Sequence, residues 1–322
     1  MTPSHRRGPL ERARFALDVL GLLPLDERLA EVRLALKGDE STPPSRFDAT
    51  SLKILKPGLA LRMWLGVRRG DRRVPIYNLF NRTPTEESRG WSVRKTQVRD
   101  FRGGTLTYDS HNGTDFATPP GTVVVAPAPG RVALVVSEFN RGGLKVMLDH
   151  GAGLTTTSAH LARALVSEGE VVPRGAPIAL SGASGLNFVA ALGLDAPHLH
   201  FNTWLDGVPV DPFASPGEVS LWRTGSLSPV PDRADDDEPV PPSGFDAAAV
   251  DAWIASCRHP DLRARLEAID DLERRACHTI FYANYYPTRF ARRVSPYASR
   301  PARRPLLDLP FRAEDYAGIA WS

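Results

Sequence analysis

The chain has 322 residues, which allows one to three domains, and its 42% hydrophobic content is enough for a packed core. Its 40 lysines and arginines are nearly balanced by 37 acidic residues, so the overall charge does not call for a nucleic-acid partner. The only cysteines, Cys257 and Cys277, allow a disulfide without requiring one and say little about the compartment.

Residues 1–104 are predicted to form an N-terminal extension of helices followed by β-prone pieces. Apolar residues recur at helical spacing over 11–37, and Pro24 interrupts the run, which predicts two short helices. Residues 59–67 are then predicted as a strand, with 68–72 as a turn and 74–80 as the partner strand.

Residues 105–222 are dense in valine, glycine and proline, which is typical of short antiparallel strands joined by tight turns. Residues 223–246 are rich in proline, serine and aspartate and are interpreted as a linker. Residues 247–322 are predicted to be a helical C-terminal region with a basic tail, with Asp246 capping its first helix and the aromatic cluster 281–286 packing against the main domain. The predicted fold class is therefore α+β.

The basic tail, Arg289–Arg304, holds six arginines and no acidic residue. A solvated surface is the default interpretation, and contact with an anionic wall polymer or a membrane surface is the alternative. No transmembrane helix is expected, because no run of about 20 apolar residues occurs. The basic start of the chain lacks the apolar core of a secretion signal, so the sequence leaves localisation open.

Three short motifs carry the chemistry of the chain: His111-Asn-Gly-Thr-Asp115, Ser-Ala-His160-Leu, and His198-Leu-His200. Two histidines and one aspartate suit a catalytic zinc ion, which takes three protein ligands and keeps one position open. The remaining two histidines can then transfer protons.

The spacing of the motifs predicts how these side chains are held. Residues 198–204 are predicted as a strand, in which His198 and His200 point to the same face. His111 and Asp115 are four residues apart, but Gly113 lies between them and Thr-Pro-Pro-Gly follows, which favours a loop or short strand over a helix.

The ordered set HxGxD, H and HxH, with its intervening glycine turns over roughly 105–215, resembles the zinc metallopeptidases of the lysostaphin/LytM type, peptidase family M23. This resemblance implies an open antiparallel barrel or sandwich with zinc in a groove that suits an extended peptide. It implies that His111, Asp115 and His200 bind Zn²⁺ and that His160 and His198 are the catalytic pair. The implied reaction is hydrolysis of peptide bonds in peptidoglycan cross-links or stem peptides, at the cell envelope or outside the cell.

Three positions depart from the pattern of the resembled family. Ser158 stands where a tyrosine is common, Asn202 where a glutamate is frequent, and the loop from Ser181 to Pro197 is long and carries Phe188, Leu192 and Leu194. Because that loop borders the substrate groove in the family, the choice of substrate is less certain than the chemistry.

Other functions are weighed against the zinc endopeptidase. The domain can be a non-catalytic binding or activating module for another wall enzyme, or a metallopeptidase with a protein substrate. The N-terminal extension can be an inhibitory prosegment. The remaining histidines, His5, His150, His259 and His278, are expected to be structural, and a second zinc site at Cys257 and Cys277 is disfavoured because the spacing matches no common finger.

Overall fold

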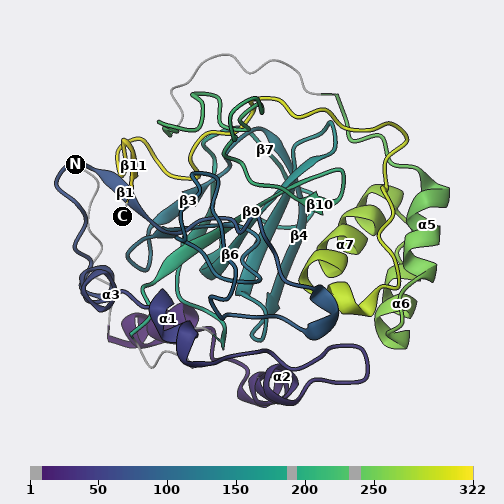
Figure 1. Ribbon diagram of the computed structural model, residues 1–322, viewed down its shortest axis with the longest axis horizontal. Coiled ribbons are helices and arrows are strands. Elements are labelled where there is room, and N and C mark those ends of the chain that lie inside the picture. Colours follow the sequence, from purple (N-terminus) through teal and green to yellow (C-terminus); the bar gives the residue numbers. More distant parts are fainter. Residues whose placement is uncertain (1–8, 187–193, 232–240, 322) are drawn as a thin grey trace.

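The computed structural model describes residues 9–186, 194–231 and 241–321 (Figure 1). A twisted sheet occupies the middle of the molecule, the N-terminal helices lie along one side of it, and the C-terminal helices lie against another side. This arrangement confirms the predicted α+β class, with helical extensions at both ends of the described chain.

The sheet is almost entirely antiparallel, and its main path runs β11-β1-β2-β9-β6-β5-β4-β7, with β10 on β9 and the β3–β8 pair attached through β6. The strands are β1 Arg73–Asn78, β2 Thr114–Ala117, β3 Val123–Val125, β4 Gly130–Glu138, β5 Gly143–Asp149, β6 Leu154–Ala164, β7 Val171–Val172, β8 Pro177–Ser181, β9 His198–Leu205, β10 Val208–Pro209 and β11 Gly318–Ala320. Short strands and tight turns over 105–222 therefore appear as the valine- and glycine-rich sequence predicts.

The N-terminal extension begins with α1 Pro9–Leu20 and α2 Leu25–Lys37, which confirms two short helices separated near Pro24. It continues with the 3₁₀ helix η1 Ala49–Ile54 and with α3 Pro57–Trp64. The predicted strand over 59–67 is wrong. Leucine, alanine, arginine and methionine are strong helix formers, Pro57 is well placed at the first helical turn, and Ala60 and Met63 are buried at helical spacing.

The second predicted strand, 74–80, is confirmed as β1, but its neighbours differ from the prediction. One edge of β1 pairs antiparallel with β2, and the other pairs in parallel with β11 near the end of the chain. Strand β1 thus joins the N-terminal extension to the sheet directly beside the strand that carries Asp115.

The C-terminal region contains α5 Ala247–Ala255, α6 Pro260–Glu267, α7 Leu272–Tyr285 and the short 3₁₀ helix η3 Pro287–Arg289. A further short 3₁₀ helix, η2 Glu87–Arg89, precedes β2. Asp246 caps α5 as predicted, since its side chain accepts a hydrogen bond from the Ala249 amide. The helices share a buried cluster with Met147 and Trp204 of the sheet, and Phe281 and Tyr285 pack edge-on against Trp204. The aromatic cluster 281–286 therefore packs against the main domain, as predicted.

The proposed division into segments 1–104, 105–222, 223–246 and 247–322 stays a prediction, and residues 232–240 of the linker lie outside the described residues. Three arginines of the basic tail have partners within the molecule: Arg289 pairs with Asp39, Arg293 pairs with Glu87, and Arg303 donates to the Asp211 carbonyl. Among the described helices, none has the length and apolar character needed to cross a membrane.

Candidate metal centre

The site is assembled on two neighbouring antiparallel strands. Asp115 lies on β2 and His200 on β9, and the register places the two residues directly opposite each other. His111 lies in the loop just before β2, so its ring can turn back toward the pair. All three side chains are buried. The sequence predictions of a loop or short strand for the first motif and a strand for the last are confirmed.

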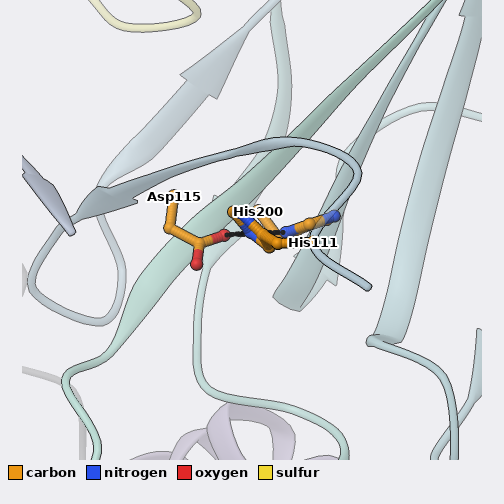
Figure 2. Close-up of side chains that lie close together, drawn as sticks. All are labelled: His111, Asp115 and His200. Carbon is orange, nitrogen blue, oxygen red and sulfur yellow. Dashed lines mark hydrogen bonds and ion pairs between the residues drawn. The ribbon is translucent and has the colours of Figure 1, made fainter. Parts of the chain in front are cut away.

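The three side chains point at one another (Figure 2). Asp115 Oδ1 lies 3.0 Å from His111 Nε2 and 2.7 Å from His200 Nδ1. His111 Nε2 and His200 Nδ1 are 3.2 Å apart. These three atoms are the ones that can face a single metal ion. Two imidazoles and one carboxylate are a donor set that catalytic zinc sites use, so the residues fit the expected metal.

Gly113, at the middle of the first motif, makes this approach possible. A Cβ atom at this position would lie 2.9 Å from His200 Nε2 and 2.8 Å from the Phe201 carbonyl oxygen. Any larger residue would push the loop away from β9 and separate His111 from His200. The glycine of HxGxD is therefore a packing requirement of the metal site.

Two groups on or next to β1 orient the ligands. Asn78 Nδ2 donates to Asp115 Oδ2 at 2.9 Å, which leaves Oδ1 directed at the two imidazoles. The Leu79 carbonyl lies 2.6 Å from His111 Nδ1, so that nitrogen carries the proton and Nε2 is free to coordinate. Such contacts around the ligands set tautomer and ring orientation, and their loss typically weakens metal binding.

The other two histidines flank the metal group and are held in the same way. His160 Nδ1 lies 2.7 Å from the Ser184 carbonyl, and His198 Nδ1 lies 2.7 Å from the Ala196 carbonyl. Their ring centroids are 4.7 Å apart. Each Nδ1 donates to a carbonyl, so each Nε2 keeps its lone pair for the site. The structure thus brings together all five histidine and aspartate side chains of the three motifs.

The protein groups alone shift the pKa values of Asp115, His160 and His198 in different directions. Burial raises the pKa of Asp115, but the adjacent His111 and His198 charges hold that pKa well below its usual value. Burial lowers the pKa of His160 well below its usual value, and repulsion from His198 adds to the shift. For His198 the effect of burial is outweighed by attraction to Asp115 and Asp195, so its pKa is raised.

An apolar cavity of about 400 Å³ lies over one side of the site, and we call it the roof cavity. Leu36, Phe47 and Leu52 of the N-terminal extension line its outer walls, while Asp115 and His198 lie on its inner wall. Residues of the N-terminal extension therefore line one cavity together with Asp115 and His198.

Several residues that support the site were not predicted from the sequence. Tyr77 contacts the His198 ring at 5.4 Å between centroids and donates through its hydroxyl to Asp195 at 2.6 Å. Asn78 and Leu79 follow directly, so three consecutive residues of the N-terminal extension touch the site. In the sequence these three residues are recognisable only as part of a β-prone stretch. Nothing in the sequence connects that stretch with the histidine and aspartate motifs, which lie more than 30 residues away.

Two of the departures from the family pattern lie in the described structure. Asn202 donates to the carbonyl and the side-chain oxygens of Asn112 and accepts from the Tyr285 hydroxyl, so it joins the metal loop to α7. Ser158 is buried on β6. In the long loop Leu194 is exposed, whereas Phe188 and Leu192 lie outside the described residues.

Two of the remaining described histidines have structural contacts. His150 bridges the Pro129 carbonyl and the Thr156 hydroxyl, and His259 accepts the Leu262 amide at the start of α6. His278 lies on α7, and His5 is outside the described residues. Cys257 and Cys277 are both buried and free, with no disulfide between them.

Comparison with known proteins places the motifs in a family context. Residues 109–212 match the model of peptidase family M23. The peptidoglycan DD-endopeptidase ShyB of Vibrio cholerae is 32% identical over 175 residues, which cover 54% of this chain and 39% of ShyB. The peptidoglycan DD-endopeptidase ShyA of the same organism is 38% identical over 183 residues, which cover 55% of this chain and 39% of ShyA.

A solved structure, described as a zinc containing peptidase from Vibrio cholerae, is 32% identical and covers 45% of this chain and 39% of that one, with a TM-score of 0.32. At this TM-score the similarity carries no information about the fold, which is defined by the strands and their register. The chain spans about two fifths of the length of ShyA and ShyB, the two curated relatives named above.

Proposed function

We propose that the protein is a zinc-dependent endopeptidase that hydrolyses peptide bonds of bacterial peptidoglycan, because residues 109–212 match the model of peptidase family M23. The observation that carries the proposal is the convergence of His111, Asp115 and His200 beside a second pair of histidines. The peptidoglycan substrate is supported by the names of ShyA and ShyB, both peptidoglycan DD-endopeptidases.

In this proposal His111 Nε2, Asp115 Oδ1 and His200 Nδ1 hold the zinc ion. When bound, zinc supplies a Lewis acid that makes water nucleophilic near neutral pH and polarises a carbonyl group. The contribution of the chain is to present these three atoms from one side, so that the face toward His160 and His198 stays open to substrate.

His160 and His198 act as the proton-transfer pair of the reaction. Hydrolysis of a peptide bond needs a base to take a proton from the attacking water and an acid to give one to the leaving amine. Each imidazole has its Nδ1 fixed on a backbone carbonyl, so its Nε2 is held in one orientation without an entropic cost during the reaction. Groups of this kind typically contribute about 10²–10⁴-fold to the rate.

The test measures zinc content and peptidoglycan clearing together, on the wild type and on three variants. We expect about one zinc per chain and clearing by the wild type, and loss of both in His200→Ala. We expect His160→Ala to retain zinc and to lose clearing by about 10²-fold or more. His278→Ala, on α7 and away from the site, is the matched control and should behave as the wild type.

Each contrary outcome identifies a different failure. A wild type that binds no zinc would overturn the metallopeptidase. Zinc with no clearing would reject peptidoglycan as the substrate, and cleavage in a panel of other peptides would then indicate a protein substrate. Clearing that survives in His160→Ala would reject the proton-transfer role of this histidine.

A further inference from the structure

A buried arginine without a carboxylate partner lies next to the metal centre. Arg141, in the turn between β4 and β5, is only 8% exposed. Its guanidinium lies over the rings of Trp91 and Tyr286, at 5.4 and 5.8 Å from their centroids. These rings come from the N-terminal extension and from the end of α7, so Arg141 lies where three parts of the chain meet.

The hydrogen bonds of Arg141 leave much of its donor capacity unused. Nη1 donates to Ser45 Oγ at 3.1 Å and to the Asn140 carbonyl at 3.4 Å. Nε is buried and has no hydrogen-bond partner in the described part of the molecule. No carboxylate among the described residues forms an ion pair with this side chain, and its direct contacts are neutral oxygens and aromatic rings. Burial lowers the pKa of its guanidinium, and Tyr286 and the Glu138 carboxylate offset only part of that effect.

The other buried arginines differ from Arg141 in this respect. Arg28 pairs with Glu31 at 2.7 Å, Arg174 pairs with Asp308 at 3.1 Å, and Arg289 pairs with Asp39 at 3.2 Å. Burying a cation without an opposite charge is unfavourable, since the lost hydration is not replaced. Among the described buried arginines, Arg141 is thus the exception, and a ligand that brings its own negative charge would remove the cost.

Two cavities share Arg141 as a wall. The first, which we call the side cavity, has a volume of about 230 Å³ and is also lined by His111, Asn112, Tyr285 and Arg293. The second is small, about 50 Å³, and is lined by His160 and His200. Arg141 therefore lies between the histidines of the site and a space large enough for a small peptide group.

We propose that Arg141 anchors a subsite for a carboxylate of the peptide substrate, in the side cavity next to the metal centre. The planar guanidinium matches a carboxylate, which it can bind with two parallel hydrogen bonds. Because His111 lines the same cavity, the carboxylate belongs close to the scissile bond. The preferred substrates are then peptides with a free carboxyl group near the point of cleavage, and this preference rests on the proposed peptidase function.

The neighbouring side chains support a subsite for one charge. Arg293, the other cation on the wall of the side cavity, already pairs with Glu87 and donates to Asn284. The remaining polar groups on the wall include the amides of Asn81 and Asn112. The wall of the side cavity thus carries Arg141 without an ion-pair partner, the mutually paired Arg293 and Glu87, and neutral polar groups, which suits a single carboxylate better than a multiply charged phosphate.

The experiment compares two peptides that differ only in one charge: acetyl-Lys-D-Ala-D-Ala and its C-terminal amide. Binding is measured by calorimetry on the full chain after removal of metal, so that neither turnover nor zinc contributes. We expect the wild type to bind the free acid about tenfold to a hundredfold more tightly than the amide, as a charge-assisted pair would provide. Arg141→Gln should bind both peptides equally, whereas Arg293→Gln should keep the preference.

The outcomes separate this inference from the proposed function. Equal binding of both peptides by the wild type, a preference that persists in Arg141→Gln, or no binding of either peptide at millimolar concentration would each overturn the subsite. A preference retained by Arg141→Lys but not by Arg141→Gln would support a charge contact. Equal melting temperatures of the wild type and the three variants would exclude a loss of fold. Failure of the peptidase proposal would instead appear in zinc content and clearing, which this measurement does not use.

Discussion

The segment 109–212 and the chain on either side of it contribute differently to the site. The five site residues, His111, Asp115, His160, His198 and His200, all lie within the segment that matches the peptidase family. The groups next to them come partly from outside it: Asn78 and Leu79 precede the segment, and Tyr285 follows it. Reactive groups are therefore concentrated in one segment, whereas their orientation depends on the whole chain.

The sheet topology explains this difference. Strand β1 of the N-terminal extension pairs with β2, so its backbone lies one strand spacing from Asp115. Truncation to the family segment alone would remove Asn78 and the Leu79 carbonyl together. A deletion of residues 1–95, the direct way to look for an inhibitory prosegment, would do the same and would confuse loss of a cover with damage to the metal centre.

The largest effect that would test this comparison is expected at Asn78, which we regard as a positioning residue. Asn78→Leu keeps the size of the side chain but removes the donor to Asp115 Oδ2. We expect zinc affinity to fall about 10- to 100-fold, as for other contacts that orient metal ligands. Competition with a chelator measures the affinity, and Asn78→Ser, which retains a donor, should recover part of it.

Arg73→Ala is the matched control for Asn78, since Arg73 is exposed on the same strand. It should leave zinc affinity unchanged. Equal affinity of Asn78→Leu and the wild type would mean that the family segment orients its own ligands and that the comparison is wrong.

The next effect separates a structural histidine from the functional ones within the same segment. Burial lowers the pKa of His150 to about 4, from 6.5 in the unfolded chain. Because the pKa of His150 is lower in the folded state, the stability of the fold is unaffected by this ring above pH 6.5. Below pH 6.5 the fold loses stability progressively until the pH reaches about 4, because the unfolded chain binds the proton more readily. We expect the free energy of unfolding to drop by about 2 kcal/mol near pH 5, as urea titrations would measure.

His150→Gln removes the titrating ring and should flatten this part of the pH profile while leaving zinc binding unchanged. A profile of the variant that still falls as steeply between pH 6.5 and 5 would show that other groups control the acid sensitivity.

The smallest effect concerns the roof cavity. Phe47→Ala removes a ring from the outer wall of the space above Asp115 and His198. If the N-terminal extension acts as an inhibitory cover, the rate of peptidoglycan clearing should rise by a factor of a few. Leu29→Ala, an exposed position on α2, is the control. An unchanged rate in Phe47→Ala would argue against inhibition by this wall, without the damage to β1 that a long deletion causes.

The metal ligands could be predicted from the sequence because the patterns that identify them are local. HxH on a strand and HxGxD in a tight loop fix side-chain directions over a few residues, and the β-branched and aromatic composition of 198–204 identifies the strand. The orienting contacts of Asn78 could not be predicted, because they depend on a strand pairing between segments more than 30 residues apart.

The error at residues 59–67 has a local cause. Leu59, Leu61 and Met63 alternate as in a strand, yet burial follows Ala60 and Met63 at helical spacing, and Leu61 is exposed. Intrinsic helix preference outweighs the alternation there. For Arg141 the limit is the opposite one. Nothing in the sequence distinguishes this arginine from the others, because what sets it apart is that no described carboxylate forms an ion pair with it.

The backbone of His160 has a consequence for how its role can be isolated. Its φ of 58° lies in the left-handed region, which a non-glycine residue occupies at a cost of about 1–2 kcal/mol. Alanine at this position keeps the strain and removes the ring, whereas glycine removes both. His160→Gly therefore leaves a relaxed backbone and a ring-sized space, into which free imidazole from solution can enter. Chemical rescue by an added small molecule would then attribute the lost rate to the imidazole itself and not to the strand that carries it.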